Sequence, residues 1–157
     1  MGVGRWALGV DTIINMEVSD VRRRLRAAME EAKRRSAERR TRVDETSRAW
    51  EEALTATAVP AFNTLASALA GEGLRFKVLT PSGSVRLALE RSADEFIELA
   101  LDTDRDDPAV MVRSTRGRGR RIVSIERVFR EGTAVSAMSQ EDVVGVVLDE
   151  LVPFIER

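Results

Sequence analysis

The apolar and polar positions of this chain follow two different periods, and the change falls near residue 73. Between residues 19 and 70 there is no Gly and a single Pro, and apolar or small side chains recur every eleven residues. The two rows of this repeat are Val21, Ala32, Val43, Leu54 and Leu65, and Leu25, Ser36, Ser47, Ala58 and Leu69. Because eleven residues make three turns of an α-helix, such a stripe runs nearly straight along one face. The pattern predicts a long amphipathic helix over residues 17–72, kinked near Pro60, whose nitrogen has no hydrogen to donate.

The length of this predicted helix favours assembly with a second copy. At 1.5 Å per residue it spans roughly 75–80 Å, whereas a domain of this chain length has a radius of gyration of about 15 Å. Either the helix breaks in the polar segment 33–48, or it continues and meets another chain as a coiled coil. We expect a homodimer, because Val18 and its apolar neighbours otherwise have nothing to bury them. The candidate interface residues are Val21, Leu25, Met29, Val43 and Leu54.

After Gly73 the period falls to two. Apolar side chains alternate with polar ones in five short segments between residues 74 and 130, separated by turns at 81–83, 92–94, 102–108 and 116–120. Five strands at hairpin spacing predict an antiparallel β-meander. One face is aliphatic and the other is mixed or charged, which is typical of a sheet covered on one side.

The last segment predicts a second helix over residues 139–157. Ser139 and Asp142 have the spacing of a capping box, and a wide apolar arc follows them. We expect this helix to pack on the aliphatic sheet face. The predicted fold class is therefore α+β, with a long N-terminal helix, a five-stranded antiparallel meander and a C-terminal helix. Residues 17–157 form one domain in this interpretation, and residues 1–16 a flexible arm.

The residue types that are missing narrow the chemistry. The chain has no His, Cys or Tyr, so the usual general base, soft metal ligand and thiol nucleophile are absent. Asp102, Asp104 and Asp106 copy the first ligands of a calcium loop, but Asp107 replaces the Gly and Arg113 the final Glu of that pattern. We expect no catalytic site, no cofactor and no metal. A carboxylate-dependent hydrolase is the less favoured enzymatic reading.

Two basic segments suggest an anionic partner. The turn near residue 117 carries five arginines, which are Arg113, Arg116, Arg118, Arg120 and Arg121. Residues 22–42 hold ten Lys or Arg against three Glu. The net charge is only -1 and no aromatic residue lies between these arginines, so a solvated hairpin is the simpler interpretation. Nucleic-acid association through the hairpin and the basic helix is the alternative function.

The favoured function is a non-catalytic interaction or adaptor module that acts as a homodimer. The basic residues are almost all Arg, with only Lys33 and Lys77 as exceptions, which is typical of a GC-rich bacterial genome. The first residues do not resemble a signal peptide, and we expect no segment to span a bilayer. We therefore expect a cytoplasmic bacterial protein without a membrane partner.

Overall fold

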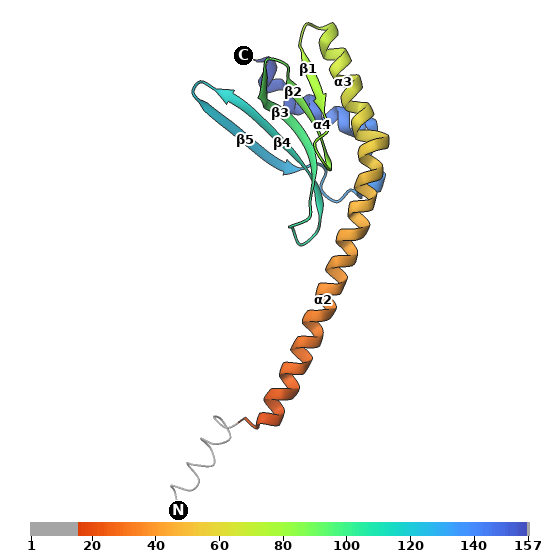
Figure 1. Ribbon diagram of the computed structural model, residues 1–157, viewed down its shortest axis with the longest axis vertical. Helices are drawn as coiled ribbons and strands as arrows, with labels where there is room; N and C mark the ends of the chain where they lie inside the picture. The colour runs from red at the N-terminus through yellow and green to blue at the C-terminus, as the bar shows by residue number, and fades with distance from the viewer. Residues whose placement is uncertain (1–15, 157) are drawn as a thin grey trace, which may run out of the picture. The chain divides into compact units, whose positions relative to one another are not determined.

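A computed structural model describes residues 16–156 of the chain (Figure 1). The helices are α2 (Val18–Ala53), the π-helical turn η1 (Leu54–Ala58), α3 (Val59–Gly71), the short 3₁₀ turn η2 (Val135–Ala137) and α4 (Gln140–Ile155). The strands are β1 (Phe76–Leu79), β2 (Ser84–Leu89), β3 (Ser92–Asp102), β4 (Ala109–Arg118) and β5 (Arg121–Val128). This order confirms the α+β class. The arm expected over residues 1–16 lies, except for Met16, outside the described residues. The chain divides into two units, Met1–Thr41 and Arg42–Arg157.

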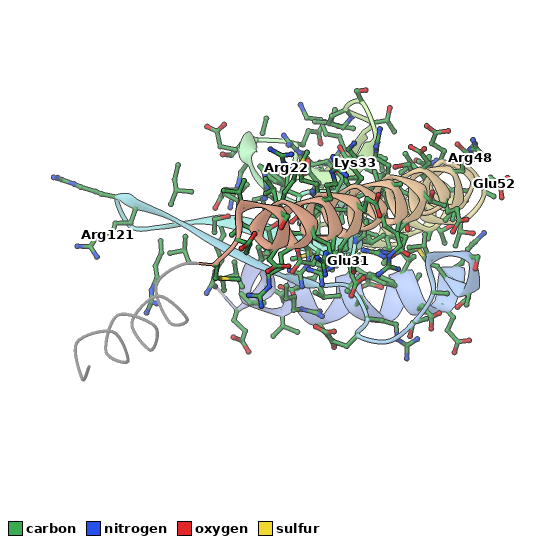
Figure 2. All side chains as sticks on the ribbon, turned by 90° about the horizontal axis from the view of Figure 1, so that it is seen from below. Arg22, Glu31, Lys33, Arg48, Glu52 and Arg121 are labelled. Atoms are coloured by element: carbon green, nitrogen blue, oxygen red, sulfur yellow. The ribbon has the colours of Figure 1, made fainter. Side chains whose placement is uncertain are left out.

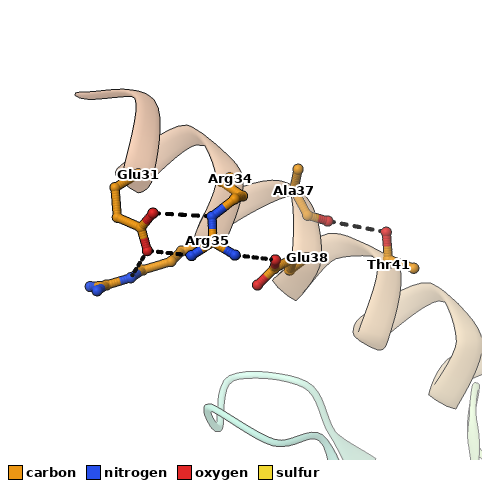
Figure 3. Close-up of polar contacts among 6 residues, drawn as sticks. All are labelled: Glu31, Arg34, Arg35, Ala37, Glu38 and Thr41. Atoms are coloured by element: carbon orange, nitrogen blue, oxygen red, sulfur yellow. Dashed lines mark hydrogen bonds and ion pairs between the residues drawn. The ribbon is translucent and has the colours of Figure 1, made fainter. Parts of the chain in front are cut away.

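Helix α2 continues through the polar segment 33–48, so the helix does not break there. Figure 3 shows the contacts that stabilise this segment: Arg34 pairs with Glu31 one turn before it and with Glu38 one turn after it. Arg35 also reaches Glu31, at 3.1 Å. These pairs span three or four residues, the spacing at which helix side chains meet. The hydrogen bonds from Arg34 hold the pKa of the Glu31 carboxyl below its usual value.

The irregularity expected at Pro60 takes the form of a π-helical turn. Residues 54–58 widen into this turn directly before α3, and Pro60 lies in the first turn of α3. A proline inside a regular α-helix clashes with the carbonyl of the fourth residue before it, and it leaves that carbonyl without a donor. A wider turn relieves the clash without ending the helix.

The five strands form one antiparallel sheet in chain order. The turn between strands β2 and β3 is shorter and lies earlier than expected, because Leu89 pairs with Ser92 and a bulge shifts the register next to Leu89. The turn therefore lies at residues 90–91, and the prediction of a turn at 92–94 was wrong. Gly119 closes the β4–β5 hairpin at a φ of 64°, which suits the first central position of a two-residue turn.

The core lies on one face of the sheet, between the strands and helices α3 and α4. Leu87 and Leu99 are fully buried there, together with Phe62 of α3 and Val147 of α4. Trp50 at the end of α2 joins this core, and its Nε1–H donates to the carbonyl of Gly83 at 2.8 Å. The aliphatic face that the sequence predicts is thus the face that the helices cover.

The opposite face carries a ladder of alternating charges. The register places Arg86, Glu98, Arg113 and Glu126 side by side across β2, β3, β4 and β5. The closest pair is Arg86 and Glu98, whose Nη2 and Oε2 atoms lie 2.6 Å apart. Opposite charges on neighbouring strands attract, so these side chains pair with one another on the face opposite to the one that α3 and α4 cover.

The C-terminal helix begins as predicted. Asp142 N–H donates to the Ser139 hydroxyl, and Ser139 N–H donates to the Asp142 carboxylate, which completes the capping box. Arg130 also pairs with Asp142. These interactions, with the Ser139 bonds as the largest cause, hold the pKa of the Asp142 carboxyl below its usual value.

Candidate interaction surfaces

An apolar stripe is exposed on the N-terminal half of α2. Val18, Val21, Leu25 and Met29 recur at intervals of three or four residues, so they share one helix face. Their exposed fractions are 71, 47, 57 and 50 %, respectively. Four large apolar side chains in a row on a helix whose other residues there are mostly charged form a surface that favours a partner. We call these four residues the α2 stripe.

The five interface residues predicted from the sequence divide between two environments. Val21, Leu25 and Met29 lie in the exposed α2 stripe. Val43 is half-buried, and Leu54 packs against the core of the second unit. The eleven-residue repeat therefore continues along the helix, but its N-terminal positions are exposed to solvent and its C-terminal positions pack against the core.

The residues beside the α2 stripe are mainly basic. Arg22 and Lys33 point to the same side of α2, and Glu31 points to the other side (Figure 2). Arg23 pairs with Asp20 at 3.0 Å, and Glu31 holds Arg34 and Arg35. Ten cationic against three anionic side chains over residues 22–42 leave this part of the helix with a net positive charge.

The structure separates the five hairpin arginines. Arg113 lies in the charge ladder, 3.9 Å from Glu98 and 4.0 Å from Glu126. Arg116 lies on the helix-covered face and donates to the Pro153 carbonyl at 3.4 Å. The remaining three stand exposed at the hairpin tip and form no ion pair within the described part of the chain; they are Arg118, Arg120 and Arg121. Alternation along β4 causes this separation, because neighbouring residues of a strand point to opposite faces.

The acidic turn before β4 is a polar loop. Asp104 N–H donates to the Asp102 carboxylate at 2.9 Å, which is a local turn bond. Within residues 16–156, no group of three or more acidic side chains is arranged to hold a metal ion. The pKa of the Glu31 carboxyl is lowered by hydrogen bonds from Arg34, and that of the Asp142 carboxyl by the Ser139 bonds of the helix cap, so both shifts have structural causes.

Sequence reasoning missed an apolar cavity at the end of the sheet. It has a volume of about 580 Å³ and lies between the α3–β1 loop, the β2–β3 turn and the end of α4. The rings of Phe76 and Phe154 meet edge to face in its wall, 6.2 Å apart. Arg75 and Arg91 stand at the rim. No periodicity signals such a site, because it is assembled from three separate segments of the chain.

One helical segment, Val18–Gly71, is long and apolar enough to cross a membrane by length and composition. No segment of this kind is expected from the sequence, and the long helix meets the criterion by length and composition alone. Residues 53–71 carry no charged side chain, and the helix continues through them past Pro60. In the structure, Phe62, Leu65 and Leu69 of this run are buried in the core.

Comparisons with protein-family models, with curated proteins and with solved structures found no match. The residues and their geometry therefore carry the functional argument.

Proposed function

We propose that this protein is a non-catalytic interaction module that joins two copies of itself through the α2 stripe. The observation that carries the proposal is the exposure of four large apolar side chains on one face of a continuous helix. A second copy presents the same face, so stripe can pack against stripe in an isologous contact. The bacterial cytoplasm expected from the sequence is part of this proposal.

The expected affinity is moderate. Fully burying one aliphatic side chain contributes about 1.5–3 kcal/mol, and these side chains are about half exposed, so eight of them contribute about 6–12 kcal/mol. Loss of translational and rotational freedom costs about 4–15 kcal/mol. Only the most favourable combination, about 12 kcal/mol gained against about 4 kcal/mol lost, leaves a net of about 8 kcal/mol, so a dissociation constant of about 1 μM is the tightest that the α2 stripe supports.

Light scattering after size exclusion tests the proposal at tens of micromolar chain. We expect a mass of at least twice 17.4 kDa for the parent, and half the parent's mass for Leu25→Asp. The matched control is Ala27→Asp, which introduces the same single negative charge at an exposed position on the opposite side of the helix, outside the α2 stripe. Equal masses for the parent and Leu25→Asp would contradict pairing through the stripe.

The charge beside the α2 stripe gives a second, independent signature. Two basic helices repel each other, and salt screens that repulsion. Raising the salt concentration from about 0.05 M to about 0.5 M should therefore strengthen self-association. Association that weakens with salt would instead indicate an anionic partner for this helix.

The alternative function, nucleic-acid association, is supported by the exposed arginines of the hairpin tip. Three phosphate contacts would give a slope of about -3 in log affinity against log salt. We expect weak binding, because the net charge of -1 provides no long-range attraction for polyanions. Fluorescence titration with short DNA and RNA decides the point. Submicromolar binding at about 150 mM salt that is lost when Arg118, Arg120 and Arg121 become Ser would favour this alternative.

A further inference from the structure

Strand β5 is an open edge of the sheet. It spans eight residues and pairs only with β4 among the described strands. Figure 1 shows β5 at the outer side of the sheet, with no other strand or helix of its unit along this edge. Ile122 and Ile125 of β5 are 67 and 51 % exposed, and they lie on opposite faces of the strand. A long edge strand with exposed apolar side chains is a template for pairing with another strand.

The hairpin geometry shows which backbone groups this edge presents. Phe129 N–H donates to the carbonyl of Val110, the residue opposite it on β4. Hydrogen-bonded and non-hydrogen-bonded pairs alternate along an antiparallel ladder, and Ile125 is four residues from Phe129, so Ile125 and Ser114 also form a hydrogen-bonded pair. The odd-numbered residues of β5 therefore direct their N–H and C=O groups to β4. Those that direct them away from the sheet are Ile122, Ser124, Glu126 and Val128.

We propose that β5 pairs antiparallel with β5 of a second copy, with Ile125 opposite Ile125. In this register Ser124 faces Glu126 of the other copy, and Ile122 faces Val128. These are hydrogen-bonded positions on both strands, so the outward N–H and C=O groups satisfy one another. The two Ile125 side chains then meet in a close, non-hydrogen-bonded pair on the same sheet face.

Charge selects this register over its neighbours. The two nearest registers that keep the outward backbone groups paired differ from the proposed one by a shift of two residues. A shift in one direction places Glu126 opposite Glu126, and a shift in the other direction places Arg121 opposite Arg127. Both alternatives bring like charges directly across a strand pair, which is unfavourable. In the proposed register no like charges face each other, and Arg127 lies opposite Val123. The strand is thus complementary to a second copy of itself.

This surface is independent of the α2 stripe, because the two contain different residues. A chain that uses both would join more than two copies. Failure of one proposal therefore does not affect the other. The variants below are made in a Leu25→Asp background, which removes pairing through the α2 stripe, so that they report on β5 alone.

Single cysteines test the register, since the chain has no cysteine of its own. Opposed residues of a non-hydrogen-bonded pair have Cα atoms about 4.5 Å apart, within the range that a disulfide spans. Ile125→Cys should therefore form a covalent dimer under mild oxidation. Ile122→Cys is the matched control, because its two copies would lie six positions apart, about 20 Å along the strands. We expect disulfide formation about tenfold faster for Ile125→Cys.

A second pair of variants tests the backbone contact. Ser124→Pro removes an N–H that points away from β4, whereas Ser124→Ala retains it; both lose the hydroxyl contact to Thr115, at 3.2 Å in the parent. Combined with Ile125→Cys, Pro should abolish the cross-link and Ala should preserve it. Circular dichroism establishes that each variant is folded. Absence of the Ile125→Cys cross-link, or equal rates for the two cysteines, would overturn the proposal.

Discussion

The pair formed by Arg86 and Glu98 offers the sharpest test of the energetics of this sheet. The Glu98 side chain is only 7 % exposed, although it lies on the sheet face opposite to helices α3 and α4. Its Oε2 accepts from Arg86 Nε at 2.9 Å and from Nη2 at 2.6 Å. The guanidinium of Arg86 in turn lies 3.8 Å above the ring of Phe96. Glu98→Gln removes the charge and keeps the shape, so Arg86 retains its position without its counter-ion.

The magnitude follows from the burial of the two partners. Breaking a buried ion pair by removing one charge costs about 3–5 kcal/mol. Arg86 is 26 % exposed, and its contact with Phe96 is retained, so we expect a loss of about 2–3 kcal/mol. Replacing both partners, as in Arg86→Met with Glu98→Leu, removes the unpaired charge as well. The double variant should lie within about 1 kcal/mol of the parent.

Urea unfolding followed by far-ultraviolet circular dichroism measures these differences. All variants are compared at one chain concentration, because self-association would contribute to the apparent stability. We expect the midpoint to fall for Glu98→Gln with an unchanged slope, and to recover in the double variant. A Glu98→Gln loss below about 0.5 kcal/mol would show that surface screening governs this pair. A double variant as unstable as the single one would refute the argument from the unpaired charge.

Three further outcomes are expected. Asp142→Asn should lower the thermal midpoint at pH 7, and the difference from the parent should disappear at acid pH. Folding lowers the pKa of Asp142, so its contribution to stability is present above the unfolded-state pKa and is lost as pH falls through the folded-state pKa. A difference in midpoint that does not change with pH would contradict the role of the charged cap. Trp50→Phe should lower the free energy of unfolding in urea by about 2–3 kcal/mol, since the Gly83 carbonyl loses its donor and a void opens. An unchanged midpoint would show that the Trp50 contact does not stabilise the fold. Thermal midpoints in EDTA and in millimolar calcium should agree, and a rise with calcium that Asp104→Asn abolishes would show a metal site.

The sequence predicted the elements well because their signals are local. An eleven-residue period, a change to a period of two and the Ser139–Asp142 cap each depend on a few neighbouring residues, and all three were confirmed as a helix, strands and a helix start. The turn between β2 and β3 was misplaced, because the bulge next to Leu89 depends on how two strands pair. The continuity of α2 through residues 33–48 was left open, since it depends on ion pairs that periodicity does not weigh.

What the sequence by itself determined is therefore the order of helices and strands and the absence of His, Cys and Tyr chemistry. Only the tertiary structure decided which surfaces are available. It packed Leu54 against the core and left Leu25 exposed, and it divided the five arginines near residue 117 between two sheet faces and a turn. It also brought Glu98 between two arginines from strands distant in sequence. The reason is physical: periodicity fixes which face of an element a side chain occupies, but burial and pairing depend on what the rest of the chain places against that face.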